Sequence, residues 1–122
     1  MNFLLVFIGG GLGSISRFGI SVLLKNHGYT LPLATFFANA ISCIVLGVLV
    51  GWTIKSGQAS DIQKYMLITG FCGGFSTFST FSNETFQLFQ SGNVATAFGY
   101  VLLSLVVGLF CIYLGMKMGQ TI

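Results

Sequence analysis

Charged residues are almost missing from this 122-residue chain and make up only 6% of it. Soluble domains carry about a quarter charged residues, so the composition excludes a soluble protein. Apolar residues make up 54% of the sequence, and the mean hydropathy is +0.91. These values indicate an integral membrane protein, and the length allows one domain over residues 1–122. We expect the lipid bilayer as its surroundings and no nucleic-acid partner.

Titratable side chains are equally scarce, which argues against an enzyme. General acid and base catalysis can draw only on Asp61, Glu84 and His27. Asp61 and His27 fall in expected loops, so no nucleophile, base and orienting group can be assembled. We therefore expect no enzymatic activity.

The cysteines are too scattered for a zinc or disulfide site, and the glycines do not complete a dinucleotide-binding motif. Cys43, Cys72 and Cys111 lie in three different apolar segments, with no close pair and no histidine beside them. This spacing indicates neither a zinc site nor a disulfide framework, and we interpret the three as small buried residues. The run Gly11 to Ser16 lacks the third glycine of a dinucleotide-binding motif and follows no strand.

The few charges divide the chain into four apolar segments. A helix needs about 20 mainly apolar residues to cross the hydrocarbon core, so we predict an all-α membrane protein with four transmembrane helices. Pairs of small residues four positions apart predict close packing of these helices in a tight bundle. The helices are expected at 2–24, 31–54, 62–90 and 95–118, and the pairs are Gly9 with Gly13, Gly47 with Gly51, Gly70 with Gly74, Ser104 with Gly108, and Gly115 with Gly119.

The basic residues hardly favour one orientation in the membrane. With four crossings, Lys55, Lys64 and Lys117 share one side, against Lys25 and Arg17 on the other. This bias is weak, so the chain can insert either way up. Two oppositely inserted copies would form an antiparallel dimer, and so few helices need a partner to enclose a polar path.

The segment 73–84 is unusual for a membrane helix, because it combines two glycines, a phenylalanine at every third residue and many hydroxyls. An unpaired backbone group in lipid costs several kcal/mol and is tolerated only where it faces protein, water or an ion. We predict a break in the third helix near 73–77, and such a break suggests a binding site. If Gly73 and Gly74 interrupt the helix, freed carbonyls from two copies can surround a monovalent cation. A hydrated cavity is the alternative.

The phenylalanines of this segment suggest a way to bind an anion. On a continuous helix, Phe75, Phe78 and Phe81 would form a slanted stripe beside hydroxyls that include Ser79 and Thr80. Aromatic rings have positive edges. Ring edges and hydroxyl donors can replace part of an anion's hydration shell and still release it. The alternative is a stripe that serves packing alone.

Five further residues each have two possible roles. The Asn39 amide is costly in a membrane helix unless it is hydrogen-bonded; it either donates to an anion or clamps a hydroxyl or carbonyl. Arg17 draws anions to a pore mouth or anchors at the interface, and Glu84 lines a vestibule or caps a half-helix. The hydroxyls of Tyr100 and Ser104 extend a polar track. Alternatively, Tyr100 belongs to an interfacial belt of aromatic residues and Ser104 bonds to its own backbone.

The run Gly73 to Phe81, followed by Glu84, resembles the motif of the Fluc (CrcB) fluoride ion channels. Gly10 to Gly13 with Arg17 is similar to the family's first helix, and Leu31 to Asn39 to its entry into the second. The resemblance covers nearly the whole chain. It implies a passive, fluoride-selective channel that exports fluoride across the cell membrane, here a bacterial inner membrane. It also implies a four-helix subunit with a broken third helix, assembled as a dual-topology antiparallel homodimer.

The resemblance also implies roles for single residues. A structural sodium ion would be held at the dimer interface by the backbone carbonyls of Gly73 and Ser76 from both subunits. Gly108 stands where some members carry a polar residue, which leaves a polar track beyond Ser104 in doubt. The implied fluoride pathway comprises Asn39, Phe78, Ser79, Thr80, Phe81, Tyr100 and Ser104, with Arg17 and Glu84 in the vestibule.

Two other functions stay open at this point. A small proton-coupled exporter with four helices needs a carboxylate deep in the membrane, usually in its first helix, and the first helix here has none. A non-transporting membrane assembly subunit would use the same small residues for packing. That function gives no reason for the repeat of hydroxyls and phenylalanines.

Overall fold

The apolar segments form helices in the computed structural model, which describes residues 1–24 and 32–122. No strand occurs in this part of the chain, so the prediction of an all-α protein is confirmed there. Three helices are long and apolar enough to cross a membrane: α1 (Asn2–Leu24), α2 (Leu33–Ser56) and α5 (Val94–Thr121).

The expected loop with Lys25 and His27, and the first residue of the second predicted helix, Leu31, lie outside the described residues. The second helix begins at Leu33, directly after Pro32. It ends at Ser56, and Gly57 caps it with a left-handed φ of 75° and an N–H that donates to the Thr53 carbonyl at 2.9 Å. Glycine takes this conformation without steric cost.

Three helical pieces occupy the chain between α2 and α5. The first, η1 (Ile62–Cys72), is π-helical and continues directly into the short turn α3 (Gly73–Phe75). Ser76 and Thr77 are extended, with ψ of 155° and 118°. The third piece, α4 (Phe78–Gln90), then begins.

The two glycines before this junction are helical, so the expectation that they themselves interrupt the helix is wrong. Gly73 has φ −64° and ψ −39°, and Gly74 follows it within α3. Gly74 serves a close contact instead, because a Cβ there would collide with the backbone carbonyl of Gly10 in α1. The chain leaves the helical conformation only at Ser76.

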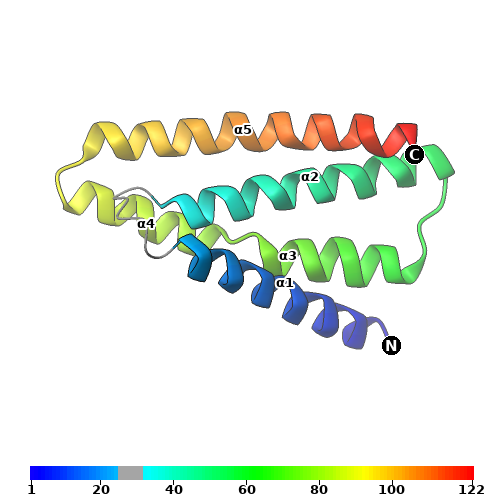
Figure 1. The fold of residues 1–122 in the computed structure, drawn as a ribbon. Coiled ribbons are helices and arrows are strands. Elements are labelled where there is room, and N and C mark those ends of the chain that lie inside the picture. Colours follow the sequence, from blue (N-terminus) through cyan, green and yellow to red (C-terminus); the bar gives the residue numbers. More distant parts are fainter. Residues whose placement is uncertain (25–31) are drawn as a thin grey trace.

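Small residues set the packing of the central helix pair, in which α2 and α5 run parallel (Figure 1). A Cβ on Gly47 would collide with the carbonyl oxygen of Ile112, and one on Gly115 with that of Ile44. Backbone therefore meets backbone along this interface, as the paired small residues predict.

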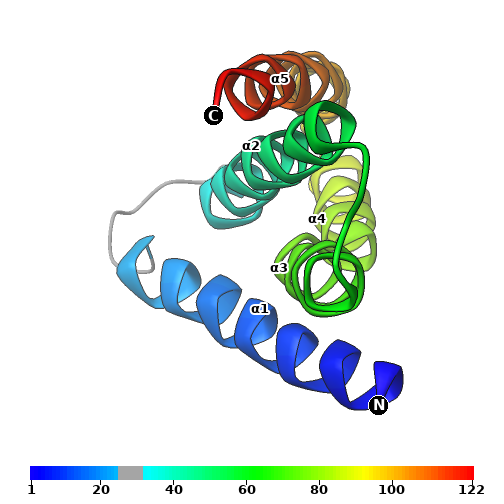
Figure 2. The same ribbon diagram turned by 90° about the vertical axis from the view of Figure 1, so that its right-hand side faces the viewer.

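The first helix packs in the same way against the middle segment, on the side away from α5 (Figure 2). Side chains on Gly9 and Gly13 would collide with the backbone carbonyls of Met66 and Phe71. Each long helix thus lies against a partner through glycines. This arrangement holds the extended junction between α1 on one side and α2 on the other.

Candidate functional site

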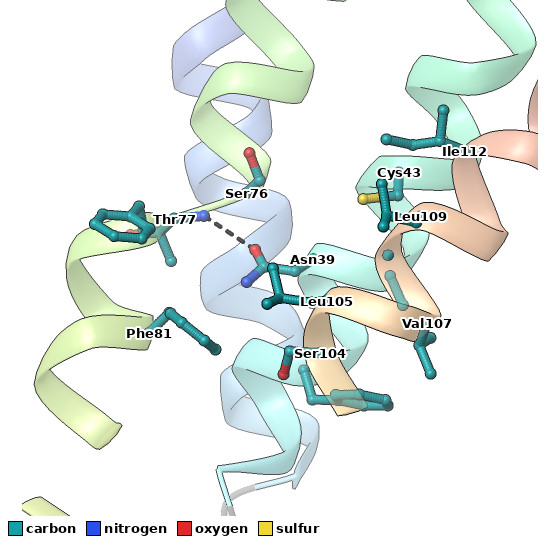
Figure 3. A pocket seen from close by; sticks show the side chains of 14 residues that line it. Asn39, Cys43, Ser76, Thr77, Phe81, Ser104, Leu105, Val107, Leu109 and Ile112 are labelled. Atoms are coloured by element: carbon teal, nitrogen blue, oxygen red, sulfur yellow. Dashed lines mark hydrogen bonds between the residues drawn. The ribbon is translucent and has the colours of Figure 1, made fainter. Parts of the chain in front are cut away.

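The extended junction is tied to α2 by one hydrogen bond. The backbone N–H of Thr77 donates to the side-chain oxygen of Asn39 at 3.0 Å (Figure 3). The Thr77 hydroxyl in turn accepts from the N–H of Thr80 at 3.3 Å and caps the start of α4. Both N–H groups therefore donate to side chains, and the carbonyls of Gly73 and Ser76 lose the donors that a continuous α-helix would give them.

In this geometry the oxygen and the NH2 group of the Asn39 amide have different roles. Its oxygen forms the clamp, although the donor is a backbone N–H and not the hydroxyl or carbonyl that the sequence suggests. Because a backbone N–H can only donate, the oxygen must face Thr77, and the NH2 group faces the cavity beside it. The amide thus clamps the chain and still offers donors.

A cavity of about 360 Å³ lies between α4 on one side and α2 and α5 on the other (Figure 3). Its wall combines uncharged polar groups with apolar side chains, and no charged residue of the described part of the chain contributes to it. The lining residues with most bearing on function are Asn39, Cys43, Ser76, Thr77, Phe81 and Ser104.

Two buried hydroxyls near this cavity have no hydrogen-bond partner among the described residues, those of Tyr100 and Ser104. Ser104 lines the cavity itself. Tyr100 is 7% exposed, and its ring lies against that of Phe81, with 5.0 Å between centroids. Buried polar groups nearly always have a hydrogen-bond partner, so each of these hydroxyls can still donate to an acceptor.

The three phenylalanines of the segment do not form one stripe, and that prediction is wrong. The junction separates Phe75 from the other two, and Phe75 is 4% exposed and stacked on Phe71 at 5.5 Å. Phe78 and Phe81 follow the junction and line the cavity, with ring centroids 6.2 Å apart. Phe78 is 80% exposed within a single chain, so its ring is available to a partner surface.

A second cavity, of about 300 Å³, holds both charged residues singled out in the sequence, Arg17 and Glu84. The guanidinium Nε of Arg17 donates to the Gly74 carbonyl at 3.3 Å, which satisfies another acceptor freed by the junction. The hydroxyl of Thr35 donates to the Glu84 carboxylate. Thr80 lines this cavity as well, so the cavity combines one cation, one carboxylate and hydroxyls.

Ser79 is exposed and lies outside both cavity linings, with its hydroxyl 3.3 Å from that of Thr77. Gly73 is also exposed, and nothing lies within 4 Å of the position of a Cβ there. The Ser76 hydroxyl donates to the Cys72 carbonyl at 2.8 Å, so it is already engaged. Across residues 1–24 and 32–122, no group of three or more His, Cys, Asp or Glu side chains can hold a metal ion.

Three residues of the site were not in the predicted set, namely Thr77, Thr35 and Cys43. Thr35 and Cys43 lie one helical turn before and after Asn39, so helical periodicity could have placed them on the same face of α2. The role of Thr77 depends on the extended junction, and its local signal is a threonine three residues before Thr80 at a helix start.

Comparison with known proteins identifies the family of the chain. The model of the family described as "CrcB-like protein, Camphor Resistance (CrcB)" matches residues 4–116. Among curated proteins, one named fluoride-specific ion channel FluC from Azobacteroides pseudotrichonymphae is 45% identical over 112 residues, 91% of this chain and 90% of the relative. A protein of the same name from Phocaeicola vulgatus is 41% identical over 120 residues, 98% of both chains. A third, from Flavobacterium psychrophilum, is 40% identical over 91% of this chain and 90% of its own.

Proposed function

Because the chain belongs to the CrcB-like protein family, a family of ion channels and not of enzymes, we propose that it conducts fluoride passively and selectively across the membrane. Family membership and three helices able to cross a bilayer make it a multi-pass membrane protein. The relatives' shared name supports fluoride as the ion. The cell membrane, in a bacterium the inner membrane, is the proposed location.

The observation that carries this proposal is the orientation of Asn39. Its oxygen is used by Thr77, so its NH2 group faces a cavity that Ser104, whose buried hydroxyl has no partner among the described residues, also lines. A dehydrated anion needs such donors. Neutral donors also bind it more weakly than a fixed cation, which allows the ion to leave again. Phe78 and Phe81 line the same cavity, and in this proposal their ring edges supply further positive potential.

Entry to this path is proposed at the second cavity. Arg17 supplies positive charge, and the hydroxyl of Thr80 supplies a neutral donor. Glu84 accepts from Thr35, which keeps its carboxylate engaged with the protein. An anion drawn toward Arg17 can exchange water for hydroxyls before it meets the amide of Asn39.

In this proposal η1, α3 and α4 together make the third crossing, broken at Ser76 and Thr77. A four-crossing subunit leaves both termini on one side, and the weak charge bias supports dual insertion and an antiparallel homodimer. The exposure of Phe78 supports a partner at that face, because its ring lies outside the packing of its own chain.

We also propose a structural sodium ion between the two subunits. The carbonyls of Gly73 and Ser76 fit such an ion, since the N–H groups of Thr77 and Thr80 donate elsewhere and hard cations prefer oxygen ligands. Two copies of the chain would supply four carbonyls. When bound, the ion would pin the subunits together and raise the positive potential near the path.

Flux measurements on purified protein in liposomes test the function. The vesicles are loaded with fluoride, an ionophore removes the membrane voltage, and fluoride efflux is recorded beside chloride efflux. Fast fluoride efflux with much slower chloride efflux is the expected result. Efflux that requires a proton gradient would favour the small exporter, and no efflux would favour the assembly subunit.

A further inference from the structure

The parallel packing of α2 and α5 places their residues opposite one another turn by turn. Gly47 lies opposite Ile112, and one turn earlier a Cβ on Gly108 would lie 3.6 Å from the sulfur of Cys43. The same register, continued back by one more turn, pairs Asn39 with Ser104 (Figure 3). The two pairs Cys43 with Gly108 and Asn39 with Ser104 all line the first cavity.

The cavity loses its polar lining on α5 beyond Ser104. Gly108 has no side chain, and Leu105, Leu109 and Ile112 surround it. On α2, however, Cys43 follows Asn39 by one turn and lines the same space. Its thiol is a weak hydrogen-bond donor. The hydroxyl of Ser76 also lines the cavity, but it already donates to the Cys72 carbonyl.

We propose that Cys43 provides the donor that α5 lacks at Gly108, and that its thiol extends the polar track beyond Ser104. This inference rests on the proposed ion path for its role, but the location of the thiol can be tested without any transport. A polarisable sulfur with a weak S–H donor suits a position where the ion must be held loosely.

The other two cysteines provide matched controls for that location. Cys72 is 4% exposed and Cys111 8% exposed, and neither lines the cavity. A small neutral reagent that enters the cavity should therefore reach Cys43 first. Methyl methanethiosulfonate is such a reagent. The Cys43 sulfur attacks its methylthio sulfur, an S–S bond forms, the S–SO2 bond breaks, methanesulfinate leaves and the thiol proton passes to water.

The first experiment is labelling of the full chain in liposomes, read by mass spectrometry of the intact protein and of its peptides. We expect one methylthio group, on Cys43, with Cys72→Ser and Cys111→Ser labelled as fast as the unsubstituted protein. In Cys43→Ser the fast labelling should disappear. Equal labelling of Cys72 or Cys111, or no fast labelling of Cys43 while the unfolded chain reacts, would overturn the location.

The second experiment measures fluoride efflux. Cys43→Ala should slow it by about fivefold, the effect of one lost hydrogen bond, and Cys43→Ser should retain it. Gly108→Ser in the Cys43→Ala background should restore flux, because its hydroxyl enters the same gap from α5. Unchanged flux in Cys43→Ala would refute the role. Absence of flux in the unsubstituted protein would instead refute the channel, and labelling would still locate the thiol.

Discussion

The side-chain oxygen of Asn39 accepts the backbone N–H of Thr77 at 3.0 Å, and this bond joins α2 to the extended junction between α3 and α4. It fixes the amide so that its two donors face the cavity. One residue thus holds the junction in place and, in the proposed ion path, offers donors to the ion, and a suitable substitution can separate the two roles.

Asn39→Asp keeps an oxygen for Thr77 but replaces the NH2 donors with a second oxygen and adds negative charge. We expect fluoride efflux to fall at least about tenfold, since a hydrogen bond to a charged group is worth about 1.5–3 kcal/mol. The oligomer, measured by gel filtration, should persist. Gln63→Glu is the matched control, because the Gln63 amide is also buried but bonds to Leu49 and Thr53 outside the described cavities. Gln63→Glu should lower thermal stability, and the fluoride flux per folded protein should remain unchanged. Wild-type efflux in Asn39→Asp would contradict the assigned role.

Phe81→Ile removes a ring that both lines the cavity and lies against Tyr100. Isoleucine has no positive ring edge, so we expect efflux to fall at least about tenfold, with a stability loss of about 1 kcal/mol from the lost aromatic pair. Phe86→Ile, on the same helix at a 58% exposed position outside both described cavities, should leave efflux unchanged. Equal effects of the two substitutions would show that general packing, and not the cavity ring, matters.

The neighbouring glycines of α3 predict opposite outcomes for one added methyl group. A Cβ on Gly74 would collide with the Gly10 carbonyl, whereas nothing in the chain lies within 4 Å of one on Gly73. Gly74→Ala should lower the thermal unfolding temperature in detergent, because α1 must shift, at a cost of about 1–3 kcal/mol. Gly73→Ala should leave the fold of the subunit intact, and any loss should appear in dimer dissociation. Similar unfolding temperatures for both variants would contradict the close contact.

Hydropathy was sufficient to predict the three helices that are long and apolar enough to cross a bilayer, because about 20 apolar residues in a row leave few alternatives there. The predicted 2–24 has the bounds of α1, and 95–118 lies within α5. Paired small residues likewise identified the contacts of Gly47 and Gly115. These features depend on local composition, which the sequence displays directly.

The junction was harder to place, because the two glycines that seemed to break the helix are themselves helical, and only Gly74 makes a close contact with α1. The chain departs from the helix at Ser76 and Thr77. There the N–H of Thr77 donates to the Asn39 oxygen and the N–H of Thr80 donates to the Thr77 hydroxyl, in place of the helical bonds. The bond to Asn39 is a tertiary contact with α2, and the bond to the Thr77 hydroxyl forms only because a new helix, α4, begins at Phe78. Local sequence preference therefore predicted a break near 73–77 but not which residues leave the helix. It also grouped Phe75 with Phe78 and Phe81, although the junction separates Phe75 from the other two.

Glu84 offers a final test between the channel and the proton-coupled exporter. Its carboxylate accepts from Thr35 and shares the second cavity with Arg17. Glu84→Gln keeps an oxygen for Thr35 and removes a negative charge from the proposed entrance, so anion entry should become at least as fast. We expect fluoride efflux to equal or exceed that of the unsubstituted protein, and an imposed proton gradient should not change it. A proton-coupled exporter would behave differently, because glutamine cannot exchange a proton and coupled transport would stop. Loss of efflux in Glu84→Gln, with the protein still folded, would therefore count against passive conduction.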